Sequence, residues 1–175
     1  MTTNIHKVMP ITLILTAFLA VAMPTDSYAQ RFKPGDDTIA EIAVTSGDFT
    51  TLVAALSCTG LVAAVADPDA ALTVFAPSDA AFASAGLDAS TICSTFDKET
   101  LTTILLYHVT GERRPSPSVI NGSNKRITML AGGSIYPVGN GSLTINANSS
   151  TVNIVAPDIL ASNGIVHVID FVLLP

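Results

Sequence analysis

The stretch Leu72–Phe82, which reads Leu-Thr-Val-Phe-Ala-Pro-Ser-Asp-Ala-Ala-Phe, decides the fold of this chain. Its first part, Leu72–Ala76, is a short apolar run with β-branched and aromatic side chains, which predicts a buried strand. Pro77 lacks an N–H to donate to a neighbouring strand and is expected to end it. Ser78 is a good helix N-cap, and Asp79 places negative charge in the first helical turn. The stretch therefore predicts a junction between a sheet and a helix, as a two-layer fold requires.

Helical patterns lie mainly before and just after this junction, and strand patterns lie behind them. We predict helices at Thr38–Ala43 (capped by Asp37), from a start at Gly47-Asp48 to Cys58, at Leu61–Ala66, and from Asp97 to Gly111, with a loop at Gly86–Ser94. Short β-rich runs punctuated by Asn-Gly and Gly-Gly follow. They predict strands near Arg126–Met129, Ser134–Pro137, Leu143–Asn146, Val152–Ala156 and Ile165–Leu174. Helices followed by antiparallel strands predict an α+β fold.

The run Ile165–Leu174 is apolar on both faces of a strand, because its odd-numbered and even-numbered positions are both mostly hydrophobic. We therefore expect this strand to lie in the middle of the structure, buried on two sides.

Residues 1–29 have the features of a cleaved signal peptide. A polar start with Lys7 precedes the nearly uncharged apolar run Val8–Ala22, and Ser27-Tyr28-Ala29 supplies small residues at the two positions that signal peptidase reads. A transmembrane anchor is the alternative, but the run is shorter than the roughly 20 residues that a spanning helix needs. We expect residues 30–37 to be a short lead-in, residues 38–175 to be one domain, and the mature chain to have no membrane span.

The composition favours an exported globular domain and argues against nucleic-acid binding. The chain is 49% hydrophobic and 13% charged, with a formal net charge of −6. An acidic protein is a poor partner for phosphate backbones, and a 6% aromatic content offers little for stacking on bases.

Two cysteines, Cys58 and Cys93, lie in the predicted domain. In an exported protein an even pair is interpreted first as a disulfide. Two buried free thiols or half of a metal site are the alternatives, and the metal site is disfavoured because no Cys-x-x-Cys or His-x-x-x-His spacing accompanies the cysteines. We predict the disulfide and no metal or cofactor.

The chain resembles the fasciclin-like domain family from Asp36 to Pro175. Leu72–Phe82 is similar to the first signature segment of the family, and Asn163–Pro175 is similar to the second. Between them, Tyr107-His108 matches a Tyr-His pair on a helix. The resemblance implies a wedge of two antiparallel β-sheets with the N-terminal helices packed along one side. The compact signal peptide and the single domain favour a bacterial member.

The resemblance also implies a secreted or surface-exposed adhesion module. In animal members the Tyr-His region and a Pro-Asp-Ile motif contribute to integrin binding, and Pro157-Asp158-Ile159 matches that motif. Ala156 stands where the animal motif has an acidic residue, which argues against an integrin. The candidate partner-binding residues are therefore Tyr107, His108, Pro157, Asp158 and Ile159.

A basic loop supplies further candidates. Arg113, Arg114, Lys125 and Arg126 stand at the two ends of one loop and favour contact with an anionic polymer such as an acidic polysaccharide, although a solvated loop is the simpler interpretation. The Pro115–Ser118 segment is expected to keep this loop out of regular structure.

Catalytic motifs are absent from the sequence. It contains no Gly-x-Ser-x-Gly, phosphate loop or dinucleotide fingerprint. His108 shares an apolar helix face with Leu101, Ile104 and Leu105, which favours a buried imidazole. His167 and Asp170 fall on opposite faces of a strand and are not expected to form a catalytic pair.

We therefore expect a secreted or periplasmic, non-enzymatic module that binds a cell-surface or matrix protein, or an acidic glycan, through surface loops. A carrier of a small apolar ligand or lipid, in a crevice between helices and sheet near Leu52–Ala66, is the alternative.

Overall fold

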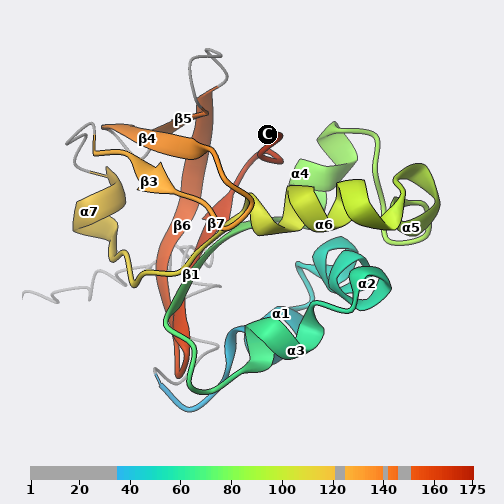
Figure 1. Cartoon of the computed structure of the whole chain (residues 1–175), viewed down its shortest axis with the longest axis horizontal. Coiled ribbons are helices and arrows are strands. Elements are labelled where there is room, and N and C mark those ends of the chain that lie inside the picture. Colours follow the sequence, from blue (N-terminus) through green and yellow to red (C-terminus); the bar gives the residue numbers. More distant parts are fainter. Residues whose placement is uncertain (1–34, 121–124, 140–141, 146–150) are drawn as a thin grey trace, which may run out of the picture.

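The computed structural model describes residues 35–120, 125–139, 142–145 and 151–175. The predicted signal peptide lies outside them. The helices are α1 (Ile39–Ser46), α2 (Thr50–Thr59), α3 (Val62–Ala66), α4 (Asp79–Ser84), α5 (Ile92–Thr95), α6 (Lys98–Leu106) and α7 (Ser116–Ile120). The strands are β1 (Leu72–Pro77), β2 (Val109–Thr110), β3 (Ile127–Thr128), β4 (Ser134–Gly139), β5 (Ser142–Ile145), β6 (Thr151–Ala161) and β7 (Gly164–Ile169). Helices α1–α6 lie together on one side of the strands, and α7 lies on the other (Figure 1). The predicted α+β class is confirmed.

The strand-to-helix junction forms as predicted, with β1 running to Pro77 itself. The Ser78 hydroxyl accepts a hydrogen bond from the Ala81 N–H and caps α4. Asp97 caps α6 in the same way by accepting from the Thr100 N–H. The prediction of Asp37 as the first cap is wrong, because Thr38 caps α1 in a capping box with Glu41.

The strands form two sheets that share β6, in the order β2-β1-β7-β6-β5-β4-β3. The first residues of β6 pair with β5, and the remainder pairs with β7. The far end of the second sheet returns to the first, because the Leu130 N–H, in the turn between β3 and β4, donates to the Val109 carbonyl of β2 at 2.8 Å. The sheets therefore enclose an interior of their own.

One pairing corrects the expected antiparallel arrangement. β1 and β7 run parallel, with Leu72 opposite Gly164 and Pro77 opposite Ile169. Hairpin signals in the sequence predict only neighbouring antiparallel strands, whereas β1 and β7 are brought together by the packing of the intervening chain.

The paired strands β1 and β7 separate two hydrophobic cores. Val74 and Val168 face the helices in the first core. Phe75 and Ile169 face the second core, which is enclosed by the sheets and α7. β7 is buried along its whole length, so the predicted central position of this strand is confirmed. Its predicted extent is wrong, since it ends at Ile169 and Phe171 and Leu174 are exposed.

Three further local predictions are corrected. The loop predicted at Gly86–Ser94 ends earlier than expected, because α5 begins at Ile92. α6 ends at Leu106 rather than at Gly111, because Val109 and Thr110 pair with β1. α7 forms inside the proline-containing loop, where prolines are tolerated because the first helical turn has no partners for its N–H groups.

Candidate binding surface

A β-bulge in β6 lies at the Pro157-Asp158-Ile159 motif. The pairing of β6 with β7 shifts register between Ala156 and Ile159. Asp158 has a φ of 57°, which is the left-handed region that aspartate tolerates better than most residues. Proline and aspartate are both poor in strand interiors, so this dipeptide is the sequence signal for an interruption of β6. The bulge re-aims the Asp158 backbone and side chain toward a neighbouring loop.

His167 of β7 joins the bulge to that loop. Its Nδ1 accepts a hydrogen bond of 3.1 Å from the Asp158 N–H, and its Nε2 donates to the Arg114 carbonyl at 2.7 Å. The imidazole is fully buried, and burial lowers its pKa, although the bond to Arg114 opposes that effect. The neutral tautomer with the proton on Nε2 satisfies both contacts at once.

Further hydrogen bonds fix the segment Glu112–Ser116 against the sheets. The Ser116 N–H donates to the Asp158 carboxylate at 2.7 Å. The Arg113 guanidinium donates to the Ser162 carbonyl at 2.6 Å. The buried Thr73 hydroxyl accepts from the Arg114 N–H at 2.8 Å and donates to the Glu112 carbonyl at 2.6 Å.

These contacts bring together two of the candidate regions from the sequence, which are the arginine-bearing loop and the Pro157-Asp158-Ile159 motif. Arg114 is joined to the Asp158 bulge through His167, and Arg113 bonds to Ser162, which follows the end of β6. The segment that carries both arginines crosses β6 before α7 (Figure 1). We call the area formed by these residues the loop–bulge surface; it consists of Arg113, Arg114, Pro115, Pro157, Asp158 and Leu160. Arg113, Pro115 and Pro157 are exposed, and the Leu160 side chain is 44% exposed.

The positive charge of this surface is partly used within the chain. Arg114 forms an ion pair with the exposed Glu112 carboxylate, while Arg113 is held by Ser162. Lys125 and Arg126 are exposed directly before β3. The surface therefore combines one outward arginine with apolar side chains, and two further cations stand at the other end of the loop.

Three other sequence candidates have buried side chains. Tyr107 is 1% exposed, His108 is 2% exposed and Ile159 is 6% exposed. The Tyr107 hydroxyl donates to the Ser134 carbonyl at 3.3 Å in the second core. These side chains are buried in the two cores and are not exposed for contact.

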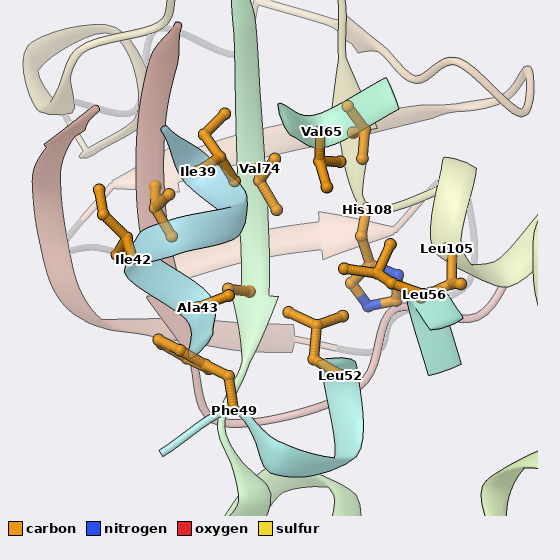
Figure 2. Close-up of a pocket in the computed structure, with 13 residues that line it drawn as sticks. Ile39, Ile42, Ala43, Phe49, Leu52, Leu56, Val65, Val74, Leu105 and His108 are labelled. Atoms are coloured by element: carbon orange, nitrogen blue, oxygen red, sulfur yellow. The ribbon is translucent and has the colours of Figure 1, made fainter. Parts of the chain in front are cut away.

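His108 is surrounded by apolar side chains of the first core. Its Nδ1 donates to the Ile104 carbonyl at 2.7 Å, and its Nε2 accepts from the Leu173 N–H at 2.8 Å. Figure 2 shows the ring beside Leu56 and Leu105. Complete burial lowers its pKa to about 4, although the bond to Ile104 opposes that effect. The adjoining cavity has a volume of about 20 Å³, which holds no more than a water molecule.

Asp170 is separate from both histidines. Its carboxylate accepts from the backbone and side-chain nitrogens of Asn153, each at 2.8 Å, and so fixes the start of β6. Within the described part of the chain, no group of three or more His, Cys, Asp or Glu residues could hold a metal ion. Cys58 and Cys93 form a disulfide that links α2 to α5.

Helices on one side of two sheets, which share one long bulged strand, define an α+β wedge domain. The chain belongs to the fasciclin family, whose Fasciclin domain model matches residues 47–175. Fasciclin domains are generally non-catalytic adhesion-type modules, typically extracellular or surface-associated. None of the helices in the described residues has the length and apolar character needed to cross a membrane.

Relatives of known sequence or structure agree with this assignment. Protein sll1483 of Synechocystis is 37% identical over 142 residues, which are 79% of this chain and 73% of that protein. Fasciclin-1 of Schistocerca americana is 31% identical over 109 residues, which are 58% of this chain and 16% of that protein. A solved FAS1 domain pair from the insect cell adhesion molecule fasciclin I has the same fold, with a TM-score of 0.65 and 20% identity. The match covers 81% of this chain and about half (52%) of that one.

Proposed function

We propose that the protein is an exported, non-catalytic adhesion module that attaches to a cell-surface or matrix protein, or to an acidic glycan, through the loop–bulge surface. The observation that carries the proposal is the position of His167, which fastens the arginine-bearing segment to the β6 bulge. A surface whose backbone is already fixed loses little conformational freedom on binding, which favours affinity.

The chemistry of the surface favours a protein partner first. Leu160 of β6 is 44% exposed, and the exposed Arg113 bonds to Ser162, which follows the end of the same strand. Arginine beside exposed apolar side chains is typical of protein interfaces. Lys125 and Arg126 add the positive charge that an acidic glycan would require.

The state of the histidines supports a non-catalytic role. In the described residues, both nitrogens of His108 and both nitrogens of His167 are engaged with backbone groups. A general base needs a nitrogen within reach of a substrate proton. Neither imidazole offers one.

The proposal is tested by measuring retention of purified protein on native cell surfaces and on beads coated with polygalacturonate. We expect Arg113→Glu combined with Leu160→Asp to reduce retention on cells at least tenfold. The control is Val44→Asp, because Val44 is 64% exposed on α1, and this variant should bind as the wild type does. Equal retention of all variants would show that the loop–bulge surface is not the binding site.

The glycan arm uses alanine substitutions at Arg113, Arg114, Lys125 and Arg126. If an acidic glycan is the partner, these substitutions should weaken retention on the beads, and added salt should weaken the wild type in the same way. If the partner is a protein, bead retention should be weak throughout, and only retention on cells should respond to the Leu160 change.

A further inference from the structure

An apolar cavity with a volume of about 130 Å³ lies between α3, α6 and the turn that joins β3 to β4. None of the residues of the loop–bulge surface lines it, and it borders the small cavity beside His108, with which it shares Leu56, Val65, Leu105 and Val109. Its walls come from distant parts of the chain and include Leu61, Ala64, Leu72, Leu106, Val109 and Leu130. We propose that this cavity binds a small uncharged hydrocarbon group, with the size of one aromatic ring or a short alkyl chain.

The lining determines the chemistry of the ligand. Each side chain that lines the cavity is aliphatic, so a polar ligand atom placed there would lose its bonds to water and gain none from these side chains. An enclosed apolar cavity of about 150 Å³, engineered in another protein, binds benzene. The cavity described here has nearly that volume, which is far too small for a folded peptide segment and suitable for a single ring.

The partly exposed lining residues leave the cavity accessible from the surface. Leu61, Leu72 and Leu106 are only partly buried, and Leu130 is 52% exposed. A ligand can therefore enter from the surface without unfolding of the core. The four leucines come from four separate segments of the chain, so the hollow exists only in the folded protein.

This cavity corresponds to the apolar crevice that the sequence analysis gave as an alternative ligand site. The expectation placed a ligand near Leu52–Ala66, and the cavity uses Leu61 and Ala64 of that segment together with α6 and the β3–β4 turn. The cavity under α1 and α2, which Figure 2 shows, is lined by apolar residues together with His108, and its volume of about 20 Å³ is too small for such a ligand.

The test is a titration of the full folded protein with benzene, monitored by carbon-13 methyl NMR of Leu106 and Leu130. We expect saturable shifts of these methyl signals. Benzoate should bind at least tenfold more weakly, because its carboxylate would lose water without gaining a partner. The absence of saturable shifts with benzene, or equal affinity for benzoate, would overturn the proposal.

Two neighbouring alanines of α3 provide matched variants. Ala64 lines the cavity. Ala63, the residue before it in the same helix, is also exposed but does not line the cavity. Ala64→Phe should weaken benzene binding at least tenfold, and Ala63→Phe should leave it within about twofold of the wild type. Equal weakening by both variants would refute the assignment. Retention on cells should not change with Ala64→Phe, so failure of this site and failure of the loop–bulge surface are distinguishable.

Discussion

The Leu173 backbone N–H donates a 2.8 Å hydrogen bond to Nε2 of His108, and so joins the end of the chain to the end of α6. These residues are 65 positions apart in sequence. The bond requires an imidazole without a proton on Nε2, because a protonated nitrogen cannot accept. His108 therefore makes the docking of the C-terminal segment sensitive to pH.

The first prediction is a loss of stability in mild acid. The pKa of His108 falls from 6.5 to about 4 in the folded protein, so the unfolded state binds more protons between these values. The contribution of His108 to the free energy of unfolding is fully present above pH 6.5, declines as the pH falls, and is lost below about pH 4. It totals about 3 kcal/mol. The lowered pKa of His167 adds to the same trend.

Urea unfolding between pH 8 and pH 5 measures this effect. The free energy of unfolding should be flat from pH 8 to 7 and then decrease by about 2 kcal/mol by pH 5. His108→Gln should be less stable at pH 7 and should show a smaller decrease. A wild-type protein with the same stability at pH 7.5 and pH 5 would contradict the prediction.

The second prediction concerns Asp79, which caps a helix other than its own. Its carboxylate accepts from the Thr50 N–H at 3.0 Å, the Thr50 hydroxyl at 2.7 Å and the Thr51 N–H at 2.8 Å, at the start of α2. The N-cap residue of α2, Phe49, makes no such side-chain bond. Burial raises the pKa of Asp79, but the bonds from Thr50 and Thr51 together outweigh it, so the pKa lies below its usual value.

Asp79→Ala should therefore lower the free energy of unfolding by about 1–2 kcal/mol, as loss of a helix cap does. Asp69→Ala is the matched control, because Asp69 is an exposed aspartate in the turn before β1. Chemical denaturation at pH 7 measures both. An equal effect of the two substitutions would show that charge, rather than capping of α2, is responsible.

The third prediction concerns Gly164, where β7 starts against β1. A Cβ atom at this position would lie 2.2 Å from the Leu72 carbonyl oxygen and 2.7 Å from Cδ1 of Ile39. The oxygen belongs to a paired strand and cannot move freely. Gly164→Ala should cost about 1–3 kcal/mol or more, the range for overpacked sites.

Gly111→Ala is the control for this substitution. Its Cβ would meet only Cδ2 of Leu130, at an ordinary contact distance of 3.6 Å. Thermal melting should place Gly111→Ala close to the wild type and Gly164→Ala several degrees lower. The reverse order would mean that the close approach of β1 and β7 is not as described.

The fourth prediction concerns the disulfide between Cys58 and Cys93, which are separated by 35 positions. Replacing both cysteines by serine should lower the free energy of unfolding by roughly 3–4 kcal/mol in the chain-entropy treatment. A reducing agent should destabilise the wild type by a similar amount and leave the double variant unchanged. If the wild type is insensitive to reductant under unfolding conditions, the bridge does not constrain the unfolded chain.

Local features were predictable where the residues that act are neighbours in sequence. Ser78 and Asp97 cap the helices that directly follow them, and Leu72–Ala76 forms the expected strand, because capping and strand formation depend on adjacent residues. The two apolar faces of the run that starts at Ile165 correctly indicated a central strand. The resemblance to the fasciclin-like family, carried by its signature segments, gave the fold class.

The sequence by itself thus determined the starts of α4 and α6, the central strand segments β1 and β7, and the family. The tertiary structure alone decided the parallel pairing of β1 with β7, the capping of α2 by Asp79 and the attachment of the arginine segment to the Asp158 bulge by His167. The pairing joins Leu72 to Gly164 across 92 positions, the capping joins Thr51 to Asp79 across 28, and His167 reaches Arg114 across 53. Such contacts depend on the packing of the whole chain around two cores, and no local pattern of residues encodes it.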